Sequence, residues 1–146
     1  MNSYPESRLP GPTAYNTALL LIRIAGSLPF LYHGSAILFG AFGGPGPQKF
    51  AAFMHAPAII GYLVGLAQVA GGLAILLGIF TRIGAACIFV VMAGAVLLVH
   101  LPHGYDVSKG GMEFALAELF IAIAIIILGP GSYALGAGLP HPFHKL

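Results

Sequence analysis

Four long apolar runs separated by short loops constrain this chain more than any other feature. They lie at about residues 14–39, 57–80, 83–100 and 112–128, and their only charged side chains are Arg23, Glu113 and Glu118. A bilayer core of about 30 Å is crossed by roughly 20 apolar residues in a helix. We therefore expect an all-α integral membrane protein, folded as a bundle of four transmembrane helices.

The composition excludes several other classes of protein. Charged residues make up 7% of the chain, whereas a soluble domain carries about 25%, so this chain could not cover a water-facing surface. Six Lys and Arg against four Asp and Glu are spread thinly, which leaves no basic cluster for nucleic acid. The single Cys87 excludes an intramolecular disulfide and a cysteine-based zinc site. Its small apolar neighbours indicate a packing residue.

Helix-breaking residues predict the boundaries. Residues 1–13 form an N-terminal tail, residues 14–131 the transmembrane domain, and residues 132–146 a C-terminal tail. The first apolar run is too long for a signal-peptide core, and we expect it to be retained. Thr81-Arg82 forms a very short turn, which makes the flanking helices antiparallel neighbours, and Gly129-Pro130-Gly131 ends the last helix.

The positive charges predict the orientation. Four spans place both termini on one side of the membrane. With the termini in the cytoplasm, the inner positive residues are Arg8, Arg23, Arg82 and Lys145, and the outer ones are Lys49 and Lys109. Cytoplasmic loops carry the excess of Lys and Arg, so we expect cytoplasmic termini.

Polar side chains inside a bilayer are costly and therefore need a partner or a function. We take His33, Gln68, His100 and Glu118 as candidates for ligand binding, and Arg23 and Glu113 as structural polar residues. With a rise of about 1.5 Å per residue, His33 and Glu118 both lie roughly 9 Å from the outer surface, and Gln68 lies near the midplane.

Each of these residues also has a structural interpretation. Arg23 could reach the cytoplasmic surface or pair with an acid. Gln68 could form a hydrogen bond between helices. Glu113 suits the positive end of the helix that it begins. The two histidines lack the spacing of a metal or haem site, so we expect no metal and favour hydrogen-bonding roles for them.

Two further hypotheses concern how the helices pack together. Gly61, Gly65 and Gly72 share one helical face, and such small residues allow close helix approach, within the chain or in an oligomer. His33 and Glu118 lie at similar depth on the first and last helices. Because an unpaired carboxylate is disfavoured there, the two could form a pair beside a cavity, although Glu118 could instead face Gln68 or a neighbouring subunit.

The order of several motifs resembles that of DoxX-type membrane proteins over about residues 17–135. The motifs are Arg23, Leu31-Tyr32-His33-Gly34, Gly71-Gly72, Leu76-Leu77-Gly78, Thr81-Arg82, His100, Gly104-Tyr105, Gly110-Gly111 with Glu113, and Gly129-Pro130-Gly131 with Tyr133. The chain departs from the family at Gln68, where a glutamate is usual. This substitution removes an ionisable group from the midplane and weakens any proton-handling role there.

The resemblance implies four helices, a bacterial cytoplasmic membrane and an association with redox physiology, since relatives include the membrane subunit of a thiosulfate:quinone oxidoreductase. We therefore expect a redox-associated subunit that binds a quinone, ahead of a haem, and docks partner proteins or further copies of itself. It would be at most an oxidoreductase subunit, and no catalytic residue is identified. The alternative is a non-catalytic structural or assembly subunit of a larger membrane complex. Kinship of fold alone is an associational argument for function.

Overall fold

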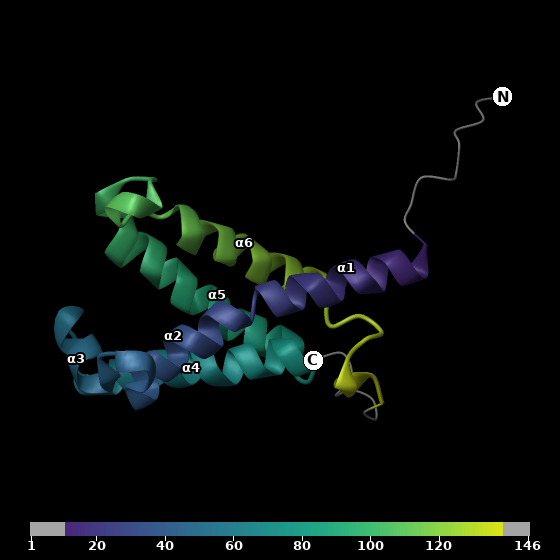
Figure 1. The fold of residues 1–146 in the computed structure, drawn as a ribbon, viewed down its shortest axis with the longest axis horizontal. Helices are drawn as coiled ribbons and strands as arrows, with labels where there is room; N and C mark the ends of the chain where they lie inside the picture. The colour runs from purple at the N-terminus through teal and green to yellow at the C-terminus, as the bar shows by residue number, and fades with distance from the viewer. Residues whose placement is uncertain (1–10, 139–146) are drawn as a thin grey trace.

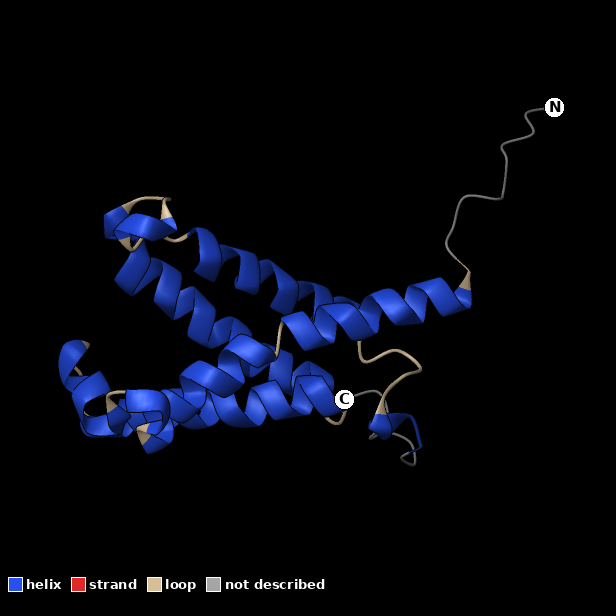
Figure 2. Ribbon diagram, in the orientation of Figure 1, coloured by secondary structure: helices blue, strands red, loops and turns tan. Residues whose placement is uncertain are grey.

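The computed structural model describes residues 11–138 (Figure 1), and every regular element within them is helical (Figure 2). Residues 1–10 and 139–146 of the two predicted tails lie outside this part. The α-helices are α1 Pro12–Ala25, α2 Leu28–Phe39, α3 Gly46–Phe53, α4 Ala58–Leu77, α5 Thr81–Gly94 and α6 Glu113–Leu128, and α5 continues as a π-helical turn at Ala95–His100. Short 3-10 turns occupy Ala41–Gly43, Leu101–His103, Val107–Lys109 and Leu135–Gly138.

Three helical segments are long and apolar enough to cross a membrane. They are Pro12–Phe39, Ala58–Leu77 and Thr81–His103. The fourth predicted span forms α6, which has 16 residues and is shorter than the usual range of about 17–25. Residues 11–138 are therefore all-helical in their regular structure and contain three candidate membrane-spanning helices.

The first predicted span is divided into two helices, which the sequence analysis did not anticipate. Gly26 and Ser27 separate α1 from α2, and Pro29 occupies the first turn of α2. Proline removes a backbone donor, and its ring clashes with the preceding turn. It therefore begins a new helix here instead of continuing the old one.

The segment between the first two predicted spans also contains more structure than the expected loop. Its eight residues Gly46–Phe53 form α3, with Pro47 in the first turn. This helix packs directly on α4, because a side chain at Gly61 would collide with the backbone carbonyl of Pro47. A glycine on α4 thus makes room for α3.

The helices form two arms that meet at one end (Figure 1). In one arm α2 and α3 pack on α4, and in the other α5 packs on α6. The arms join at the turn end, where the short α4–α5 turn makes these helices antiparallel neighbours as predicted. They separate towards the loop end, which carries α3 and residues 101–112.

The core lies where the arms meet. Phe30 of α2 clusters there with buried residues of α4, α5 and α6, namely Ile75, Ala85, Ile88, Ala122 and Ile125. Glycines bring the backbones close around this cluster. A methyl group added at Gly71 of α4 would lie 3.0 Å from the carbonyl oxygen of Gly84 on α5.

Candidate functional site

Arg23 is fully enclosed near the end of α1, with only 1% of its surface exposed. Its guanidinium donates four hydrogen bonds to backbone carbonyls. Nε and Nη2 reach Ile75 O and Leu76 O of α4 at 2.8 and 2.7 Å, and Nη1 reaches Pro130 O and Tyr133 O at 3.0 and 2.7 Å. We call this arrangement the arginine clamp.

The arginine clamp uses backbone carbonyls at the end of one helix and just beyond the end of another. The last carbonyls of a helix lack intrahelical donors and carry the negative end of its dipole. Arg23 satisfies such carbonyls in the last turn of α4 and others just after α6. Among residues 11–138 Arg23 has neither the surface exposure nor the acidic partner that were expected for it. The signal that could have revealed the acceptors is Gly129-Pro130-Gly131, which marks open carbonyls at the same end of the molecule.

Glu118 is also a buried ionisable side chain, and its surroundings differ from those of Arg23. It is 5% exposed and lies on the face of α6 that Ala115 and Ala122 also occupy. Its Oε2 has no hydrogen-bond partner among the described residues. Burying a polar atom without a hydrogen bond costs free energy. This oxygen is therefore a buried acceptor that the described part of the chain leaves unsatisfied.

Gln68 is buried on the side of α4 that faces α2. Its Cβ lies where a side chain at Gly34 would be, since a methyl group added at Gly34 would approach it to 2.8 Å. The interhelical hydrogen bond considered for Gln68 is not formed within residues 11–138. Thus α2 and α4 meet here through backbone proximity.

His33 lies on the exposed side of α2 and contacts the ring of Tyr32 edge-on, with centroids 5.2 Å apart. Helix α2 turns Phe30, Gly34 and Ile37 inwards, which leaves the imidazole outside the core. In the described part of the chain no hydrogen bond joins His33 to Glu118. The structure therefore does not contain the proposed pair.

His100 organises the loop between α5 and α6. Its Nδ1 lies 2.7 Å from Gly110 O, and the tautomer with a proton on Nδ1 donates this bond. Backbone bonds from Gly111 N to Asp106 O and from Met112 N to Gly104 O close the same loop, both at 2.9 Å. This arrangement gives His100 a structural hydrogen bond.

Glu113 stands in the first turn of α6 and is half-buried. A carboxylate suits that position because the helix N-terminus is positive. Residues 11–138 contain no cluster of three or more His, Cys, Asp or Glu side chains that could hold a metal ion.

The three candidate packing glycines all face other helices of the same chain. Gly61 faces Pro47 of α3, Gly65 faces Leu38 of α2, and Gly72 faces Leu31 and the carbonyl of Ser27. A methyl group added at Gly65 would lie 2.9 Å from the Cβ of Leu38. These contacts place the stripe inside the arm formed by α2, α3 and α4.

Of the four candidate ligand residues, the structure buries two and leaves two outside the core. Gln68 and Glu118 point into the interior, whereas His33 is exposed and His100 belongs to the loop. An apolar groove of about 600 Å³ lies elsewhere, between α4 and α5, and none of the four lines it.

The comparison with known families matches the helical region just described. The DoxX family model covers residues 18–101, from α1 to the turn after α5, and so includes Arg23, Gln68 and His100. Glu113 and Glu118 of α6 lie beyond it. No curated protein and no solved structure gives a match. Because the family model covers more than half of the sequence, the chain belongs to the DoxX family.

Proposed function

We propose that this DoxX protein crosses the bilayer four times and keeps both termini in the cytoplasm. Helix α6 is about 24 Å long at 1.5 Å per residue and packs beside α5. The arginine clamp supports its crossing, because it ties the end of α6 to the end of α4. Arg23 and Arg82 at that end favour the cytoplasmic side.

A pair of C-terminal fusions tests this topology. We expect a fluorescent protein fused after Leu146 to be bright and an alkaline phosphatase at the same position to be inactive. Active phosphatase would reverse the orientation or reduce the number of crossings. Fusions after Lys109 should give the opposite pattern and serve as the matched control.

We further propose that the protein is a redox-associated membrane subunit that binds a quinone, or a similar lipophilic molecule, between its arms. The observation that carries this proposal is the buried Oε2 of Glu118, which has no partner among the described residues. A bound hydroxyl or quinol oxygen would satisfy it. The amide of Gln68 can donate to a carbonyl, and the apolar core residues suit a hydrophobic ring.

This proposal revises the expected site. Gln68 and Glu118 would contact the ligand, whereas His33 would lie outside it on the exposed side of α2. In its carboxylate form Glu118 could accept a proton from a quinol and become the neutral carboxylic acid. Electron transfer would require a partner protein docked on the membrane subunit.

Binding of decylubiquinone to the purified protein tests the site. We expect Glu118→Leu to weaken binding at least tenfold, because it removes the acceptor oxygen. Glu118→Gln keeps an amide oxygen that can accept a hydrogen bond, so it should weaken binding less. The matched control is Glu113→Gln, which changes the other acid of α6 and should bind like the wild type. Equal binding by wild type and Glu118→Leu would exclude Glu118 from the site.

A non-catalytic assembly subunit is the second candidate, and the arginine clamp favours it. The most deeply buried charged side chain of the described chain serves packing alone. A stable complex with another membrane protein or a second copy, purified from the bacterial inner membrane without bound quinone, would support this function. Stoichiometric quinone would support the first candidate.

A further inference from the structure

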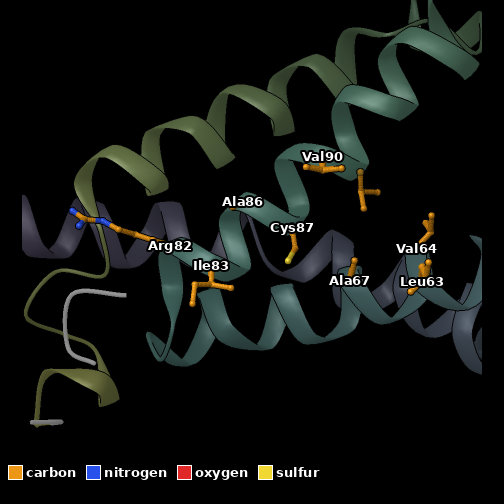
Figure 3. Close-up of a pocket in the computed structure, with 9 residues that line it drawn as sticks. Leu63, Val64, Ala67, Arg82, Ile83, Ala86, Cys87 and Val90 are labelled. Atoms are coloured by element: carbon orange, nitrogen blue, oxygen red, sulfur yellow. The ribbon is translucent and has the colours of Figure 1, made fainter. Parts of the chain in front are cut away.

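An apolar groove runs along the outside of the bundle between α4 and α5 (Figure 3). The short side chains of Ala67, Ala86 and Cys87 leave space between the larger Leu63 and Val90. The stem of Arg82 lines the groove at the turn end. Both flanking helices are candidate membrane spans, so the groove opens towards lipid.

We propose that this groove holds one acyl chain of an anionic phospholipid whose headgroup lies beside Arg82. The lining residues of α5 extend from Arg82 to Val91, a rise of about 14 Å. Half of a bilayer core measures about 15 Å. The groove therefore has the length of one acyl chain in one leaflet, with its charged end at the membrane surface.

The charge at the turn end determines which headgroup fits. Arg82 is exposed, and its Nη2 donates to the carbonyl of Ile127 at 3.3 Å, a neutral acceptor that leaves the guanidinium positively charged. The first turn of α5 begins at the same place, without an acidic residue and without a side-chain cap among the described residues. A helix N-terminus is positive and favours anions. A phosphate with a net negative headgroup complements both features.

The dimensions argue against a helix of a second copy as the occupant. A partner helix is about 10–12 Å wide and packs along a whole span. The groove ends near Val91, whereas the apolar segment continues to His103. An acyl chain needs only this shorter length. The proposal is independent of quinone binding, because neither Gln68 nor Glu118 lines the groove.

Native mass spectrometry of the detergent-purified protein tests the proposal, with phosphatidylglycerol and phosphatidylcholine as probes. We expect one retained phosphatidylglycerol, bound roughly fivefold more tightly than phosphatidylcholine, the effect of about one cationic side chain near a membrane surface. Arg82→Gln should abolish this preference, and Arg82→Lys should keep it. Equal retention of both lipids by the wild type would overturn the proposal.

A filling variant tests the position of the lipid. Ala86→Phe should block the groove and lower phosphatidylglycerol binding at least fivefold. Its matched control, Ala117→Phe at an exposed position of α6, should leave binding unchanged. Phosphatidylglycerol with a photoreactive acyl chain should label residues 63–67 or 83–91. Labelling outside these segments, or a dimer that Ala86→Phe disrupts, would assign the groove to another occupant or to a second copy.

Discussion

Two buried polar side chains, Arg23 at the turn end and Glu118 in the interior, have opposite hydrogen-bonding surroundings. At the turn end Arg23 donates to four carbonyls, so its burial joins α1, α4 and the segment after α6. Glu118 is nearly as well buried, yet its Oε2 meets no donor among the described residues. A paired group stabilises a fold, whereas an unpaired one lowers stability. The first region is therefore suited to holding the helices together, and the second is where we propose that a ligand binds.

The greatest loss of stability is expected from a substitution at the turn end. Arg23→Met removes all four hydrogen bonds to these carbonyls, of which Ile75 O keeps the backbone donor Gly78 N at 3.3 Å. Bonds from a charged donor contribute about 1.5–3 kcal/mol each, so even with partial compensation we expect at least about 3 kcal/mol of destabilisation. Thermal unfolding in detergent measures it. Arg82→Gln, on an exposed arginine, is the control and should cost far less, and equal losses would refute the special role of the arginine clamp.

A second substitution tests whether close packing holds α2 against α4 away from the arginine clamp. Gly65→Leu would force a side chain into the space of Leu38, which lies 2.9 Å from an added methyl group. Overpacking of this kind costs about 1–3 kcal/mol. Gly94→Ala is the matched control, because an added methyl group there has no described neighbour within 4 Å. An unchanged melting temperature for Gly65→Leu would show that this contact is loose.

Glu118→Leu should affect stability in the opposite direction to Arg23→Met. Replacing an unpartnered buried oxygen with an apolar side chain should leave stability unchanged or raise it by about 1–3 kcal/mol. Thermal unfolding without added ligand measures this effect. A marked loss of stability would mean that Glu118 has a structural partner in the native membrane, as Arg23 has in its carbonyls.

The smallest effect concerns the loop between α5 and α6. The side chain and then the backbone N–H of Ser108 donate to the Asp106 carboxylate at 2.7 and 2.9 Å, which lowers the pKa of Asp106 below its usual value. The bonds therefore stabilise the loop above the ordinary carboxylate pKa and are lost as pH falls through the lowered one.

Amide exchange at Ser108 follows this change in the loop. The protection factor of this amide, which corrects for the intrinsic pH dependence of exchange, should fall only in that acidic range, and Asp106→Asn should reduce this fall. An unchanged dependence in the variant would exclude Asp106 as the titrating group.

The sequence predicts the helical runs well because hydrophobicity over about 20 residues is a local signal. It also predicts the antiparallel α4–α5 pair from the short turn at Thr81. It does not predict the acceptors of Arg23. Every residue has a backbone carbonyl, so residue type does not mark the ones that accept, and Pro130 and Tyr133 lie more than a hundred positions away. The division at Gly26 and Ser27 was readable from Pro29. The exposure of His33 depends on how α2 is rotated about its own axis relative to α4. The local sequence pattern does not determine this rotation.

The order of synthesis gives the arginine clamp a consequence for biogenesis. Arg23 leaves the ribosome long before the carbonyls of Pro130 and Tyr133 exist. An arginine costs about 2.5–3.5 kcal/mol at the centre of an inserting helix and less where it can reach the membrane surface. The first segment therefore enters the membrane at a disadvantage that only the completed chain removes. Nascent chains that stop before residue 130 should remain sensitive to membrane-protein quality control, and full-length chains should escape it.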